Sequence, residues 1–219
     1  MFLTPLRLSP TAETGIEGSE LGQALRYPTL PHPKHVRLHN APKIDTAEQR
    51  KQSIQVALML TLAKLVEEME IMRIEVALDE QDLPSRLLYG TAGFIAWLDE
   101  RLKNSELSPL GMELTPAEQL DLLFYEFTSG APLAPVRHFR VVRHERFPVW
   151  ELKTPDLRVF GWFAQKDCFI AAFGDWADKI EDRGLYRGYR LEIRKLRRRL
   201  GAEADLCVDG DTPGDVLSL

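Results

Sequence analysis

The sequence contains no long apolar run and very little cysteine. Among its 219 residues, no apolar segment approaches the roughly 18 residues that a membrane-spanning helix needs. The first residues, MFLTPLRLSP, carry neither a charged leader nor an apolar core long enough for a signal peptide. We therefore expect a cytoplasmic protein that makes no contact with a membrane.

The two cysteines, Cys168 and Cys207, are too few for a disulfide framework or a cysteine-based metal site. Cys168 lies in an apolar segment, so we expect a buried side chain that behaves as a small hydrophobe. The motif PHPKHVRLH brings three histidines together, but no neighbouring cysteine or carboxylate completes a metal site. These histidines are His32, His35 and His39. The sequence therefore predicts no bound metal and no cofactor.

Basic residues are absent from the C-terminal end of the chain and are concentrated just before it. Residues 201–219 hold no Lys or Arg and 5 Asp or Glu, whereas residues 137–200 hold 16 Lys or Arg and 9 Asp or Glu. Residues 1–136 hold 12 Lys or Arg and 19 Asp or Glu. The net charge of −5 thus conceals a basic segment between two acidic ones, and it is the local potential that attracts phosphate groups.

Proline is concentrated at the start of the chain. Residues 1–45 contain 6 of the 14 prolines and show no apolar period, so we expect an extended arm. A long helix is predicted over residues 46–80, with Asp45 and Glu48 as its capping pair, because an apolar residue recurs every three or four positions. The stripe consists of Ile54, Leu58, Leu62, Leu65, Met69, Met72 and Val76.

A second helix is predicted over residues 85–104, after Pro84. Residues 46–110 are therefore expected to form a helical hairpin module. Two interpretations of the long helix stay open. It packs as a core helix against its neighbour, or its apolar stripe is a seam for a homo-oligomer or for another partner.

Residues 111–200 change in character from helix to short strands. Thr115, Pro116 and Glu118 predict a helix that starts with a capping box, and Gly130 predicts its end. Four short segments rich in aromatic and β-branched residues follow, with connections too tight for crossover helices, so an antiparallel meander is predicted. The segments span residues 136–143, 148–153, 157–164 and 167–174.

The chain ends in a basic helix and an acidic tail. A helical pattern over residues 177–200 has a break near Gly184 and stops before Gly201. Residues 201–219 are expected to be a loose acidic tail. The predicted fold class is α+β, in which an N-terminal helical hairpin precedes a domain of one helix, a four-stranded antiparallel sheet and a basic C-terminal helix.

Three motifs mark the strands of the predicted meander. They are WELK at residues 150–153, RVF at residues 158–160 and FIAAF at residues 169–173. In this order and spacing, residues 115–200 resemble the RelE/ParE toxin superfamily, and in particular its HigB-like branch, which phages and prophages often encode. The resemblance implies a RelE-like domain over residues 111–200 and says nothing about residues 1–110.

The resemblance implies a ribosome-associated endoribonuclease that cleaves messenger RNA in the A site and is restrained by a small antitoxin protein. This chemistry needs no metal, because the ribose 2′-oxygen attacks the adjacent phosphate while a base takes its proton and cations stabilise the charge on phosphorus. Arg158 is assigned to the scissile phosphate, since a guanidinium on a rigid strand binds two phosphate oxygens. Lys179, Arg183 and Tyr186 are assigned supporting or proton-transfer roles. The RNA-binding candidates are Arg187, Arg190, Arg194, Lys195, Arg197 and Arg198.

Two aspartates depart from the pattern of this family. Many HigB-like proteins carry paired lysines directly after the last strand, where this chain has Asp175 and Asp178. Carboxylates oppose the negative charge that develops on phosphorus unless one of them acts as the base. A second hypothesis therefore stays open, in which a phage or mobile element uses a RelE-like fold as a non-catalytic interaction protein.

Several groups admit both a structural and a functional interpretation. The cations of residues 194–199 suit the last turns of a helix as well as an RNA surface. The acidic tail is solvated, or it folds over the basic face as an antitoxin would. The aromatic residues of the strands fill the core or stack on bases, and these are Trp150, Phe160 and Trp162.

The remaining polar candidates lie on or beside the strands. Glu151 is expected to form a cross-strand ion pair with Lys153 and Arg158. His138 and His144 are candidates for an acid or a base, although an exposed histidine beside a strand often has no such role.

Overall fold

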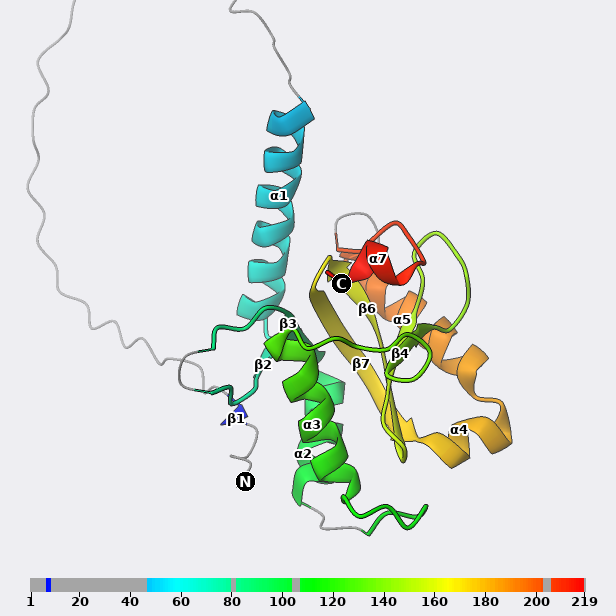
Figure 1. The fold of residues 1–219 in the computed structure, drawn as a ribbon. Helices are drawn as coiled ribbons and strands as arrows, with labels where there is room; N and C mark the ends of the chain where they lie inside the picture. Colours follow the sequence, from blue (N-terminus) through cyan, green and yellow to red (C-terminus); the bar gives the residue numbers. More distant parts are fainter. Residues whose placement is uncertain (1–6, 9–46, 80–81, 104–106, 203–205, 219) are drawn as a thin grey trace, which may run out of the picture.

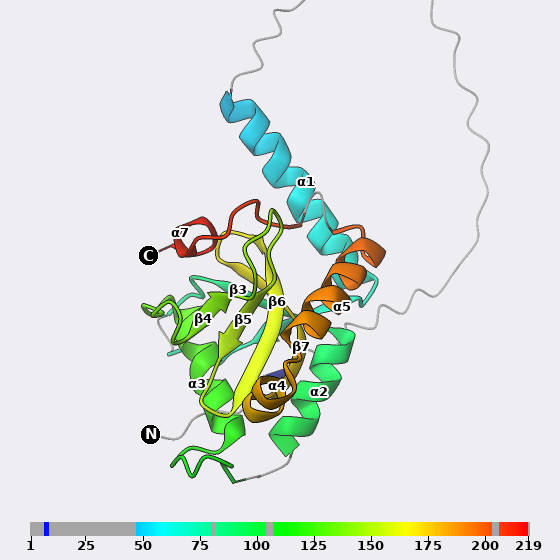
Figure 2. The same ribbon diagram turned by 90° about the vertical axis from the view of Figure 1, so that its right-hand side faces the viewer.

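The computed structural model describes residues 7–8, 47–79, 82–103, 107–202 and 206–218. Apart from two residues, the arm expected over residues 1–45, with its three histidines, lies outside the described part. The described residues form one mixed sheet with helices on both faces (Figures 1 and 2). This arrangement confirms the α+β class.

The sheet is larger than the predicted one. Its order is β1-β2-β3-β7-β6-β5-β4, where the neighbours β3 and β7 are parallel and all other neighbours are antiparallel. The strands are β1 (Arg7–Leu8), β2 (Ile71–Glu75), β3 (Leu87–Thr91), β4 (Phe139–Val141), β5 (Trp150–Lys153), β6 (Leu157–Gln165) and β7 (Cys168–Trp176). The four-strand meander is therefore present, but the prediction that it forms the whole sheet is wrong.

The composition of β7 explains why the meander does not end the sheet. Its residues are apolar on both sides, because Phe169 and Ala171 pack into the core on one face and Cys168 and Ile170 into the core on the other. A strand buried on both faces belongs in the middle of a sheet. β3 pairs with the free edge of β7 and gives it that position.

Helices cover both faces and enclose two cores. α2, α3 and α7 pack on one face, where Phe94, Phe124 and Val216 are buried. α1, α4 and α5 pack on the other, where Leu62, Ile180 and Ile193 are buried. The helices are α1 (Ala47–Glu67), α2 (Ala92–Lys103), α3 (Pro116–Ser129), α4 (Ala177–Arg183), α5 (Tyr186–Arg199) and α7 (Pro213–Val216). Trp150, Phe160 and Trp162 are buried in these cores, as the structural interpretation expects.

The N-terminal helical hairpin is not formed. α1 ends at Glu67 because Met69 adopts a left-handed conformation with φ of 56°. The backbone N–H of Met69 donates to the oxygen of Val66, and that of Glu70 to the oxygen of Leu65, which is the Schellman pattern of a helix end. The chain then reverses into β2, so the long helix predicted over residues 46–80 is wrong beyond this point.

The apolar spacing that suggested a continuous helix has another cause. Met72 and Val76 of the predicted stripe pack beside Ile74 of β2 on one face of the sheet, as alternate positions of a strand do, while Ile71 enters the core on the other face. The second predicted helix likewise begins with a strand, β3, and only its later part is the helix α2. Gly90 permits this tight strand-to-helix turn, because a Cβ there would lie 2.7 Å from Cδ1 of Ile95.

The caps of α3 and the break between α4 and α5 agree with the sequence. Thr115 and Glu118 form both hydrogen bonds of the capping box, and Gly130 ends α3 with φ of 85°. Gly184, with φ of 58°, separates α4 from α5. α5 then ends before Gly201, which also has a positive φ.

The acidic tail is packed rather than loose over its described residues. Val216 and Leu217 are fully buried. The N–H of Asp167, in the β6–β7 turn, donates to the oxygen of Val216 at 2.9 Å. Asp209 forms an ion pair with Arg146 of the β4–β5 connection at 3.1 Å. The tail therefore covers one end of the sheet.

Candidate functional site

Polar side chains of three neighbouring strands share the face of the sheet that α4 and α5 cover. Directly opposite residues on neighbouring strands point to the same face. Arg158 of β6 therefore lies beside its register partners, Lys153 of β5 and Asp175 of β7. Further along the same strands, Glu151 of β5 is opposite Phe160 of β6. Strand alternation thus brings cations, carboxylates and an aromatic ring together.

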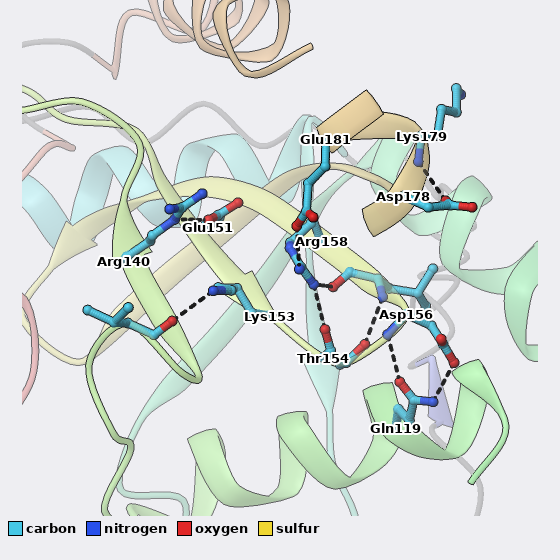
Figure 3. Close-up of polar contacts among 12 residues, drawn as sticks. Gln119, Arg140, Glu151, Lys153, Thr154, Asp156, Arg158, Asp178, Lys179 and Glu181 are labelled. Carbon is cyan, nitrogen blue, oxygen red and sulfur yellow. Dashed lines mark hydrogen bonds and ion pairs between the residues drawn. The ribbon is translucent and has the colours of Figure 1, made fainter. Parts of the chain in front are cut away.

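Arg158 is nearly enclosed, with 10% of its side chain exposed. Its Nη1 donates to the carbonyl oxygens of Thr154 at 2.5 Å and Leu157 at 3.0 Å. Its Nη2 donates to Oε1 of Glu181 at 2.9 Å, and Figure 3 shows the guanidinium pointing toward Glu181 and Thr154. The carboxylate of Glu181 therefore occupies the position beside Arg158 that the resemblance assigns to a phosphate. Arg158 links the β5–β6 turn to α4 through these hydrogen bonds.

Lys179 faces a carboxylate as well. Its Nζ lies 2.6 Å from Oδ2 of Asp175, which also accepts a hydrogen bond from the hydroxyl of Tyr189 at 2.5 Å. Burial raises the pKa of Asp175, but the hydrogen bonds from Lys179, Tyr189 and one backbone N–H outweigh burial and lower that pKa overall. Burial and the Asp175 carboxylate raise the pKa of Tyr189. Asp175 is thus a stably ionised partner and a weak base.

Among the described strands, Glu151 is the one carboxylate that is fully buried. Its partner is Arg140 of β4, whose Nε contacts Oε1, so the expected pairing with Lys153 and Arg158 is wrong. Its Oε2 has no hydrogen-bond partner among the described residues. Burial raises the pKa of Glu151, and the contact with Arg140 reduces that rise without cancelling it. Glu151 is therefore the described carboxyl of this face best suited to carry a proton.

Tyr186 closes the space above this pair. The guanidinium carbon of Arg140 lies 5.2 Å from the centre of the Tyr186 ring, a cation–π distance. The edge of the same ring meets Phe160 at a centroid distance of 5.9 Å. The sequence did not point to Arg140, although a charged residue opposite Glu151 on a short strand was the signal available.

Three basic side chains of α5 contact the connection between β4 and β5. Arg190 donates to Oε2 of Glu145 at 2.9 Å, and Arg194 lies 3.7 Å from the same oxygen. Arg197 is 1% exposed and donates to the carbonyl oxygen of Phe147 at 2.9 Å. Arg190 and Arg197 thus hold the β4–β5 connection against α5, whereas 41% of the Arg194 side chain is exposed.

Other cations of α4 and α5 face outward. Arg183, Arg187 and Arg198 are exposed and have no ion-pair partner within the described part of the chain. Lys195 pairs with Glu192 on the same helix at 2.8 Å. The candidates named from the sequence therefore divide into an enclosed set beneath the helices and an exposed set on their outer side.

The two candidate histidines, His138 and His144, contact different parts of the protein. Nδ1 of His138 accepts a hydrogen bond from the N–H of Ala134 at 3.2 Å, and the side chain lines a groove that also reaches Arg158. Nδ1 of His144 lies 2.8 Å from Oδ2 of Asp211 in the C-terminal segment. Of the two, His138 is the one that shares a cavity with a strand cation.

Among the residues that the structure describes, no group of three His, Cys, Asp or Glu side chains is arranged to hold a metal ion. None of the described helices combines the length and the apolar character needed to cross a membrane. Comparison of the chain with protein-family models, with curated proteins and with solved structures finds no match. The function is therefore inferred from the geometry of the site and from the motifs of residues 115–200.

Proposed function

We propose that the chain binds RNA, free or at the surface of the ribosome, through the outer side of α4 and α5. The contrast between two groups of cations supports this most. Arg158 and Lys179 are neutralised by carboxylates. Arg183, Arg187 and Arg198 are exposed and meet no carboxylate among the described residues. Exposed, unneutralised cations are those that gain most from a phosphate backbone.

Helix geometry places three arginines of α5 in a row. Arg187, Arg194 and Arg198 are separated by seven and four positions within α5, which puts them on one side of the helix. At about 1.5 Å per residue, the row is roughly 16 Å long. Glu145 cannot neutralise Arg194 fully, because it also pairs with Arg190. Such a row neutralises several phosphates of a single strand and carries no base specificity.

The test is fluorescence anisotropy of a labelled single-stranded RNA of about 12 nucleotides, a length within the usual range of such sites. The double variant Arg187→Gln/Arg198→Gln is expected to bind several-fold more weakly. The slope of log K against log salt should fall by about 1.4, since each lost phosphate contact removes about 0.7 for single strands. The matched control is Lys103→Gln/Lys166→Gln, which removes the same charge from α2 and the β6–β7 turn. Equal weakening by both pairs would show that only net charge matters.

A second proposal is toxin-like, metal-independent cleavage of mRNA on the ribosome, of the RelE/HigB type. The observation that favours it is Glu151, a buried carboxyl with a raised pKa and an unpartnered oxygen, one strand away from Arg158. In this proposal the phosphate displaces Glu181 from Arg158, while Lys179 and Arg183 stabilise charge. Tyr186 then moves aside and Glu151 takes the proton of the ribose 2′-hydroxyl as its oxygen attacks phosphorus. The bond between phosphorus and the 5′-oxygen breaks, and the hydroxyl of Tyr186 protonates the leaving 5′-oxygen. A small antitoxin restrains the activity.

Cleavage is tested with the full chain, because β3 pairs with β7 and a fragment of residues 111–200 lacks that strand. Induced expression in a bacterial cell should arrest growth and produce A-site cuts that primer extension detects. Arg158→Ala and Glu151→Gln should each abolish the cuts, while Glu181→Gln should increase them. Normal growth of the wild-type strain, with soluble protein present, would remove this proposal and leave the RNA-binding one intact.

A further inference from the structure

A groove lies between α3 and the β5–β6 turn, away from the outer side of α4 and α5. Its volume is about 640 Å³. Three parts of the chain enclose it: the residues just before α3, the part of α3 from Gln119 to Glu126, and the β5–β6 turn together with the residues before β4. Its aliphatic and basic lining side chains include Met112, Leu114, Leu122, Arg137, His138 and Lys153.

The floor of the groove is rigidly built. Nε2 of Gln119 donates to the carbonyl oxygen of Leu114 at 3.0 Å and to Oδ2 of Asp156 at 2.5 Å. Oε1 of Gln119 accepts the backbone N–H of Asp156 at 3.1 Å. Gln119 is 5% exposed. One buried amide thus links the segment before α3, α3 and the β5–β6 turn, and the groove is preformed.

One wall of the groove is aliphatic and open to solvent. Met112, Leu114 and Leu122 are 47%, 38% and 39% exposed. Side chains of this kind bind other aliphatic side chains, whereas nucleic-acid bases are usually held on aromatic rings. The described lining contains no Phe, Tyr or Trp, and it includes Glu113 and Glu126, which repel a polyanion. The groove therefore favours a peptide over RNA.

The lining of the groove also contains basic side chains. Lys153 uses one N–H on the carbonyl oxygen of Val136 at 2.8 Å. Burial and the neighbouring Arg158 lower the pKa of Lys153, so an anion close by is favourable. Arg137 is exposed and has no ion-pair partner among the described residues. His138 accepts a hydrogen bond at Nδ1, which leaves Nε2 as its N–H donor.

We propose that this groove binds a peptide segment of a partner protein, with aliphatic side chains against Leu114 and Leu122 and a carboxylate between Arg137 and Lys153. Charge complementarity and the aliphatic wall together define this occupant. The groove reaches Arg158 but none of the exposed arginines on the outer side of α4 and α5, so the peptide and an RNA bound on that outer side are expected to bind at the same time.

The experiment selects ligands from a random peptide library, about 12 residues long and displayed on phage, with the immobilised full chain as target. Such a length spans a groove of this kind as one short segment. Enriched peptides are expected to pair Leu, Ile or Met with Asp or Glu at a constant spacing. Their affinities are then measured by fluorescence anisotropy.

Matched variants locate the site of binding. Leu122→Ser is expected to weaken a selected peptide about tenfold, as expected for losing the burial of one such side chain. Leu191→Ser is the control, since Leu191 has the same exposure, 40%, on α5. Arg137→Gln is expected to weaken the peptide severalfold, and the exposed Arg73→Gln to have no effect. The proposal is overturned if no acidic–aliphatic motif is enriched, if Leu122→Ser binds as wild type, or if single-stranded RNA displaces the peptide.

Discussion

Replacement of Arg158 by methionine tests whether this arginine is mainly structural. The change keeps a long side chain and removes every hydrogen bond that the guanidinium makes. Nη1 is the described donor to the carbonyl oxygen of Thr154, a buried residue. The carbonyl oxygen of Leu157 keeps a second donor, the backbone N–H of Thr154 at 3.0 Å. The main loss is therefore one orphaned carbonyl and the contact with Glu181.

The loss in the free energy of unfolding can be worked out from these contacts. A buried carbonyl without a partner costs about 1–3 kcal/mol. The ion pair with Glu181 contributes at most about 1 kcal/mol, because 55% of the Glu181 side chain is exposed and screened by solvent. We expect Arg158→Met to lower the free energy of unfolding by about 2–3 kcal/mol. At about 2–4 °C per kcal/mol for a chain of this size, the Tm falls by about 4–12 °C.

The assay is equilibrium unfolding in urea, followed by the fluorescence of the buried Trp150 and Trp162. Glu181→Gln is measured beside it and should lower the free energy of unfolding by less than about 1 kcal/mol. Arg73→Met, at an exposed position of β2, is the control for the loss of an arginine. The reasoning is refuted if Arg158→Met unfolds like the wild type, or if Glu181→Gln is the more damaging change.

Three further predictions concern ionisation, reactivity and association. The lowered pKa of Asp175 means that its contribution to stability is complete above its ordinary value of about 4 and is lost as the pH falls through the folded-state value. The difference in unfolding free energy between wild type and Asp175→Asn should therefore shrink below about pH 4, and Asp178→Asn, at an exposed position, is the control for the loss of a carboxylate. Burial raises the pKa of the Cys168 thiol to about 12, so a thiol reagent should leave Cys168 intact in the folded protein and label the half-buried Cys207. The predicted stripe packs inside the protein at Leu58, Leu62 and Leu65. Other apolar side chains of α1, among them Val56 and Leu60, are exposed and should drive self-association, so Leu60→Glu should lower the molar mass found by size exclusion with light scattering. A wild-type monomer at high concentration would exclude this association.

Local signals predicted the elements that depend on neighbours in sequence. The capping box at Thr115 and the stop at Gly130 were correct, because each satisfies the backbone groups of its own helix end. The meander was correct for a similar reason, since tight turns force consecutive strands to pair with each other.

Elements that depend on distant partners were predicted wrongly. Ile71 and Ile74 keep a helical spacing, and no nearby glycine or proline marks the helix end at Met69. β2 and β3 form because β7 has an unpaired edge and apolar residues on both faces. A pattern three or four residues long cannot reveal an edge that lies about 80 positions further along the chain.

The candidate site shows the same division. The sequence identified Arg158 as an unusual cation in an apolar strand, and alternation placed it on one face with Lys153 and Asp175. It did not reveal that Glu181 faces the guanidinium, or that Arg140 and not Lys153 pairs with Glu151. Those partners are set by how α4 and β4 pack on the sheet.

By itself, the sequence determined the caps of α3, the meander and the segregation of basic residues, because each depends on local hydrogen bonding or on composition. The tertiary structure alone decided which cations are neutralised and which face solvent. Ion pairs form between side chains that packing brings within about 4 Å, and burial then raises or lowers their pKa values. For this reason Arg158 is enclosed and paired with Glu181 of α4, whereas Arg187 and Arg198 are exposed to solvent.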